Sequence, residues 1–109
     1  MPRAVHLSPA AEEDLEAIRA WFSQPGAGSR AKMRRRAIAQ AIRDLTHYPC
    51  RYPTGDHPGV HEWPVERHRV MYSIVPDTED DRMVGDVLVK AGDVQVLRVF
   101  GPGQSRASI

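Results

Sequence analysis

The feature that most constrains the fold is a change of hydrophobic period at a segment rich in proline and glycine, residues 48–59 (YPCRYPTGDHPG). Before this segment, apolar residues recur at the spacing of α-helices, and after it they alternate as in β-strands. Helices grouped before a run of strands are typical of α+β folds, in which a helix pair packs on one face of an antiparallel sheet. With 109 residues, the chain has the length of one domain, expected over residues 1–109.

The first half of the chain predicts a short strand over residues 3–7 and helices over residues 8–22 and 29–48. Ser8 is a good N-cap, and Pro9 suits the first position of a helix. The first helix is acidic and the second has a basic face, and the loop between them is short. We therefore expect an antiparallel helical hairpin whose two arms attract each other.

The second half predicts strands over residues 60–65 and 68–76, followed by an acidic loop at residues 77–81. Residues 83–90 and 93–100 alternate around the turn Ala-Gly-Asp and predict a β-hairpin. Residues 101–109 are expected to be a loose C-terminal tail. The predicted order is β-α-α-β-β-β(-β), an α+β fold with the helical hairpin packed on an antiparallel sheet.

Bulk composition narrows the classes of function. The net charge is only +1, so any nucleic-acid contact must come from a local patch. Cys50 is the single cysteine, which excludes a disulfide within the chain and fits a reducing cytoplasm. The N-terminal residues have no apolar core typical of a signal peptide, and no apolar run reaches the ~20 residues of a membrane span. A cytoplasmic protein without membrane contact is expected.

The sequence gives no support for a metal, a cofactor or a nucleophile. His57 and His61 are four residues apart, but Pro58 and Gly59 between them exclude a common helical face, and a third spaced ligand is missing. Neither a phosphate-binding glycine loop nor a G-x-S-x-G nucleophile motif is present. We expect no cofactor and no metal site.

Two basic clusters stand out. Residues 30–36 contain five basic side chains in seven positions, and Arg67, His68 and Arg69 form a second cluster near His61 and Glu62. The first cluster is either a solvated helix face paired with the acidic helix or a contact for phosphate or an acidic partner. A ribonuclease that works without metal needs a base, an acid and cations near the phosphate, and the second cluster contains such groups.

Three segments resemble the RelE/ParE superfamily of bacterial toxins from type II toxin–antitoxin systems. These are LSPAAEEDLEAIRAWF, HRVMYSIV and DVQVLRVFGPGQ, which occur in the family's order. From the first segment to the last, the resemblance extends over nearly the whole chain. The resemblance implies the predicted fold, and a toxin whose cognate antitoxin wraps a C-terminal segment over it. The stretch between the last two strands, residues 77–92, is longer than is usual in the family. An extended hairpin or an extra strand is expected there.

The superfamily divides by target, and the resemblance leaves three alternatives. RelE-like members cut mRNA on the ribosome with basic residues and a C-terminal Tyr or His, whereas ParE-like members inhibit DNA gyrase. Arg69 fits the first pattern, but "GPGQSR" lacks the terminal Tyr or His, and the near-neutral charge does not suit the ribosome. We therefore favour a ParE-like toxin that binds gyrase and is not an enzyme. The alternatives are a ribosome-dependent endoribonuclease using Arg69, His68, His61 and Glu62, and an inactive member that only binds antitoxin.

Two binding surfaces are expected from this resemblance. The antitoxin is expected in an exposed apolar groove between the helix pair and the sheet, walled by Leu15, Ile18, Trp21, Phe22 and Trp63. The alternative is that both tryptophans belong to the core. For the target, the candidate contacts are the arginines Arg34, Arg35, Arg67 and Arg69.

Overall fold

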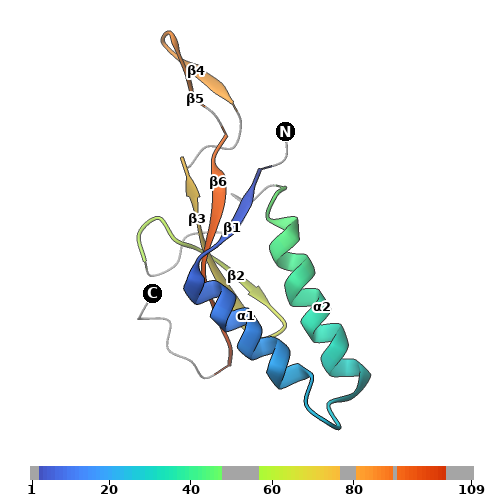
Figure 1. Cartoon of the computed structure of the whole chain (residues 1–109). Helices are drawn as coiled ribbons and strands as arrows, with labels where there is room; N and C mark the ends of the chain where they lie inside the picture. Colours follow the sequence, from blue (N-terminus) through green and yellow to red (C-terminus); the bar gives the residue numbers. More distant parts are fainter. Residues whose placement is uncertain (1–2, 48–56, 77–80, 90, 103–109) are drawn as a thin grey trace.

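The helices and strands follow the predicted order, except that two short strands stand where one strand was predicted over residues 83–90 (Figure 1). The computed structural model describes residues 3–47, 57–76, 81–89 and 91–102. The elements are β1 (Val5–Leu7), α1 (Pro9–Phe22), α2 (Gly28–Asp44), β2 (His61–Val65), β3 (His68–Val75), β4 (Arg82–Val84), β5 (Val87–Val89) and β6 (Asp93–Phe100). The α+β architecture is thus confirmed.

Both helices begin close to where the sequence places them. Ser8 caps α1, since its Oγ accepts a hydrogen bond from the backbone N–H of Ala11 at 3.0 Å, and Pro9 is the first helical residue. The second helix starts at Gly28 and ends at Asp44, four residues earlier than predicted. Leu45 and Thr46 instead donate to carbonyls three residues before them, which tightens the chain into a turn.

The four-stranded sheet has the order β1-β6-β3-β2, and β3 pairs antiparallel to both of its neighbours. Strand β1 pairs with β6 in parallel, so the predicted antiparallel sheet is confirmed except at this edge. The long connection between β1 and β6 permits the parallel direction. It also brings Ser8 beside β6, where its N–H donates to Val96 O at 3.0 Å and its hydroxyl to Leu97 O at 2.7 Å. Leu97 is the extra residue of a β-bulge in β6.

One face of the sheet packs against both helices (Figure 1). The largest fully buried side chains include Ile38 and Leu45 from the α2 region and Val70, Tyr72 and Val94 from the sheet, each at most 1% exposed. Burial of such side chains contributes roughly 1.5–3 kcal/mol each, so this layer holds the helical hairpin in place. A smaller cluster of Val60, Met71 and Phe100 covers the second face of the sheet.

Strands β4 and β5 pair only with each other, around a tight turn at Gly85 and Asp86. The prediction that residues 83–90 form a hairpin with residues 93–100 is therefore wrong, whereas the expected extended hairpin is confirmed. The physical reason is that β6 pairs with β1 on one side and with β3 on the other, so neither of its edges is left for residues 83–90. Ala-Gly-Asp therefore leads directly into β6, and Gly92 passes so close to Pro76 that a Cβ would meet Pro76 O at 1.6 Å.

Candidate functional site

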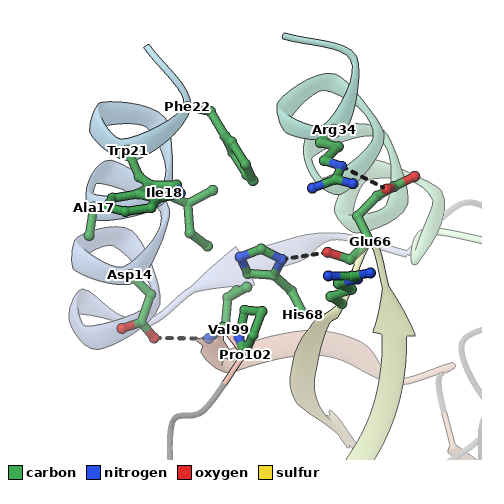
Figure 2. A pocket seen from close by; sticks show the side chains of 12 residues that line it. Asp14, Ala17, Ile18, Trp21, Phe22, Arg34, Glu66, His68, Val99 and Pro102 are labelled. Atoms are coloured by element: carbon green, nitrogen blue, oxygen red, sulfur yellow. Dashed lines mark hydrogen bonds and ion pairs between the residues drawn. The ribbon is translucent and has the colours of Figure 1, made fainter. Parts of the chain in front are cut away.

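A cleft of about 480 Å³ opens between α1, α2, the β2–β3 turn and the end of β6 (Figure 2). We call it the Trp21 cleft. Its walls are Asp14, Ala17, Ile18, Trp21 and Phe22 of α1, Arg34 of α2, Glu66, Arg67 and His68 at the turn, and Val99, Gly101 and Pro102 at the end of β6. A volume of this size suits a few side chains of a bound protein segment or a small ligand.

The wall from α1 is aromatic and partly exposed. Phe22 is buried and lies tilted against the His68 ring, with 5.9 Å between the ring centroids. Trp21, one residue earlier, is 66% exposed, because the helical period turns it out of the core. The alternative that Trp21 belongs to the core is therefore excluded, and the cleft has an aromatic rim of the kind that anchors protein contacts.

The opposite wall is a turn held in an uncommon backbone conformation. Glu66 and Arg67 have φ values of 49° and 64°, as in a two-residue hairpin turn that usually contains Asn or Gly. This conformation costs roughly 1–2 kcal/mol per ordinary residue. His68 helps to fix the turn by donating from Nδ1 to Glu66 O at 2.8 Å. Arg34 lies 3.9 Å from the Glu66 carboxylate, and both side chains are more than one-third exposed, so this ion pair adds little stability.

The floor of the cleft is secured by Asp14. Its carboxylate accepts hydrogen bonds from Arg98 Nε at 2.7 Å, Arg98 Nη2 at 3.0 Å and the backbone N–H of Val99 at 2.9 Å. Strand β1 ends at Leu7, opposite Val96, so Asp14 takes the place of a neighbouring strand for the next part of β6. The hydrogen bond to Asp14 raises the pKa of the Arg98 guanidinium, and burial opposes that rise. The side chain therefore stays cationic.

The residues predicted to bind antitoxin fall into two groups. Ile18, Trp21 and Phe22 line the Trp21 cleft together. Leu15 and Trp63 pack against the core and are not among the lining residues, since Leu15 lies on another side of α1 and Trp63 lies on β2 opposite Val70.

The candidate ribonuclease residues are divided between the two faces of the sheet. His68 is buried on the face that meets the helices, and His61 stacks on Tyr72 there with 5.2 Å between ring centroids. Arg69 points to the second face because successive residues of a strand alternate, and Glu62, paired with Met71, lies on that face as well. The sheet therefore separates the two histidines from Arg69 and Glu62.

The four arginines predicted to contact the target do not form one patch. Arg34 and Arg67 meet at the Trp21 cleft. Arg35, the next residue of α2, lies along a different groove, and Arg69 is exposed on the second face of the sheet.

Sequence reasoning missed Asp14 and Glu66. Asp14 is one of several acidic residues of α1, and its contact with Arg98, 84 positions away, has no local signal in the sequence. Glu66 lacks the Asn-Gly signature that normally marks its turn.

The structure adds two observations on other classes of site. Among the described residues, no group of three or more His, Cys, Asp or Glu side chains is placed to hold a metal ion. Within the same residues, neither helix has the length and apolar character required to cross a bilayer.

Comparisons with known proteins agree with this fold. Residues 5–99 match the family described as "ParE toxin of type II toxin-antitoxin system, parDE". A solved structure, "Chromosomal ParDE TA system from P. aeruginosa", superposes with a TM-score of 0.64 at 16% sequence identity, covering 92% of this chain and 96% of that chain. Curated protein sequences gave no significant match. Because the family match spans nearly all of the fold described above, the chain belongs to the ParE toxin family of type II toxin–antitoxin systems.

Proposed function

We propose that this toxin is neutralised by a cognate antitoxin, part of which fills the Trp21 cleft, and that it inhibits growth by binding DNA gyrase. Membership of the ParE family is the observation that carries the proposal. The similar structure from P. aeruginosa is itself described as a toxin–antitoxin system.

A binding mechanism is supported by the placement of the candidate catalytic groups. General acid–base catalysis requires each group within hydrogen-bonding reach of the atoms that it serves. His68 and His61 lie on the helix-covered face of the sheet, and Arg69 is exposed on the other. One RNA phosphate could not contact Arg69 and the two histidines together unless the sheet rearranged.

The chemistry of the Trp21 cleft supports a peptide segment as its occupant. Trp21 offers a large rigid surface at low entropic cost, with Ile18 behind it. Arg34, Glu66 and Arg67 give the rim charges of both signs, and the weak Arg34–Glu66 pair is easily exchanged for contacts with a partner. An amphipathic segment with an apolar anchor and flanking charges would match this lining.

The antitoxin part of the proposal is tested by co-purification. A small reading frame next to the toxin gene is first sought as the candidate antitoxin gene. Tagged toxin is then expressed together with its product, and the Trp21→Ala variant is compared with Met33→Ala. Met33 is also exposed, at 68%, but is not among the residues lining the cleft. Loss of an aromatic anchor should weaken binding by roughly tenfold or more, whereas Met33→Ala should bind normally. Equal binding by both variants would place the antitoxin elsewhere.

The target is tested with purified toxin in two assays. In a DNA supercoiling reaction, the toxin should inhibit gyrase, and in a translating extract, mRNA should remain intact. Cleavage of mRNA that is abolished by Arg69→Ala would reject the gyrase proposal in favour of a ribonuclease. Normal growth on induction of the toxin without antitoxin would indicate an inactive family member.

A further inference from the structure

The β4–β5 hairpin exposes apolar side chains on both of its faces. Met83 and Leu88 are paired across the hairpin and are 60% and 50% exposed, and Val84 and Val87 form the next pair at 56% and 64%. Successive residues alternate between faces, so each face carries one of these pairs. A two-stranded hairpin is marginally stable in water by itself, and exposed apolar clusters of this kind mark contact surfaces.

The root of this hairpin is fixed to the body of the protein. Ala91 donates its backbone N–H to Asp81 Oδ1 at 2.7 Å, which closes the two ends of the hairpin. Arg3 donates from Nη1 to Gly92 O at 3.0 Å, and the Gly92 backbone lies directly against Pro76. The hairpin is therefore held in a defined position and projects from one end of the sheet (Figure 1).

A second surface has the complementary character. Between the outer sides of α1 and α2 lies a groove of about 470 Å³, which we call the arginine groove. Its lining is Leu7, Leu15, Ile18, Ile38, Ala39 and Ile42, together with the arginines Arg19, Arg35, Arg36 and Arg43. Arg35 and Arg43 donate to the neutral side chains of Ser23 and Gln40, and Arg19 is 3.9 Å from the exposed Glu16. The groove is apolar inside and cationic at its rim.

The charge of the hairpin segment is opposite to that of the arginine groove. Residues 77–92 contain five acidic and two basic side chains, so the apolar hairpin lies within a net acidic segment. Such a segment is repelled by nucleic acid and by anionic membranes, and attracted to a basic, apolar protein surface. This chain itself carries a surface of that description.

We infer that the β4–β5 hairpin of one toxin molecule docks into the arginine groove of a second copy. The contact joins two different surfaces, so it closes into a dimer if each molecule donates its hairpin to the other, and otherwise it extends into chains. The described hairpin supplies eight residues and the groove ten. One such contact is smaller than the roughly 20–30 residues per side of a stable interface, so the association is weak and depends on concentration. The inference concerns self-association and is independent of the toxin's target.

The first test measures the mass of the full-length toxin by sedimentation velocity from low to high micromolar concentration. The wild-type toxin should shift from monomer to a larger species. The hairpin variant, Met83→Asp with Leu88→Asp, and the groove variant, Arg35→Glu with Arg43→Glu, should each weaken association by roughly tenfold or more. Met33→Asp removes an equally exposed apolar side chain outside both surfaces and should associate like the wild type. Circular dichroism checks that each variant is folded.

The second test mixes the two defective variants. The hairpin variant keeps its groove and the groove variant keeps its hairpin, so the mixture should form a one-to-one complex that neither variant forms alone. If two toxin molecules instead associate through the edges of their hairpins, the groove variant should associate like the wild type. The mixture would then form no specific one-to-one complex, and this outcome would overturn the inference. A wild-type toxin that stays monomeric at every concentration would also overturn the inference. If the hairpin variant then lost inhibition of the target, the hairpin would be a surface for the target and not for a second copy.

Discussion

Replacing Asp14 by alanine tests how strongly its carboxylate holds the part of β6 that lies beyond the end of β1. We call these contacts of Asp14 with Arg98 and Val99 the clamp. The change removes two hydrogen bonds from Arg98 and one from the Val99 backbone. The Asp14 and Arg98 side chains are 13% and 25% exposed, so the pair lies between a surface ion pair, worth ~0–1 kcal/mol, and a buried pair, whose disruption costs ~3–5 kcal/mol. We expect a loss of about 2–3 kcal/mol in the free energy of unfolding.

The assay is chemical or thermal unfolding followed by circular dichroism. For a two-state domain near 100 residues, 1 kcal/mol lowers Tm by ~4–8 °C, so Asp14→Ala should lower it by about 10 °C or more. Glu16→Ala is the matched control on the same helix, because Glu16 is 71% exposed and its ion pair with Arg19 is long, at 3.9 Å. This change should alter the free energy of unfolding by less than ~0.5 kcal/mol. A loss no larger than that of the control would refute the role of the clamp.

Two extensions separate the ion pair from other contacts of Arg98. Arg98 also lies over the Phe100 ring at 4.5 Å, so Arg98→Ala removes more than the contact with Asp14. A double-mutant cycle, which compares the variant with both changes to the two single variants, therefore isolates the coupling between Asp14 and Arg98. The hydrogen bond to Asp14 raises the pKa of Arg98 in the folded state. The contribution of the Arg98 charge to stability is therefore complete at any pH below the usual pKa of arginine, and it is lost only as the pH rises through the raised pKa. On the Arg98 side, the coupling should thus stay constant between roughly pH 6 and 9.

Three further substitutions test the local structure by the same unfolding assay. Ser8→Ala removes the cap of α1 and the bond to Leu97 O, and should cost about 1–2 kcal/mol; a neutral result would show that the cap is dispensable. Ile38→Ala leaves a cavity in the core and should cost ~2–5 kcal/mol, unlike Met33→Ala on the exposed side of α2. Gly92→Ala forces a Cβ against the Pro76 backbone and should cost at least ~2 kcal/mol, and unchanged stability would mean that the crossing readily opens.

Much of the fold follows from local signals in the sequence. The Ser8-Pro9 start and the helical spacing from Ala11 to Phe22 define α1, because cap chemistry and the 3.6-residue period act within a few positions. The alternation in residues 68–75 likewise defines β3, the strand with partners on both sides. The family resemblance rests on these two segments together with DVQVLRVFGPGQ, which contains β6.

Local signals in the sequence do not show which strands pair with each other or which distant side chains make contact. Alternation predicted one strand over residues 83–90 and missed the turn at Gly85 and Asp86 that divides it. It also could not show which strand lies beside it, because registry depends on distant backbone groups. The sequence also gave no reason to pair Asp14 with Arg98 or to set Glu66 and Arg67 in a left-handed turn.

The candidate site shows the same division. The sequence by itself determined the element order, the aromatic and apolar stripe of α1 and the basic face of α2, since each arises from the period of one helix. Only the tertiary structure decided that Trp21 faces outward beside Glu66 and Arg67, and that the sheet separates His68 from Arg69. The physical reason is that a cleft, and the face on which a side chain lies, are fixed by the packing of segments far apart in the chain.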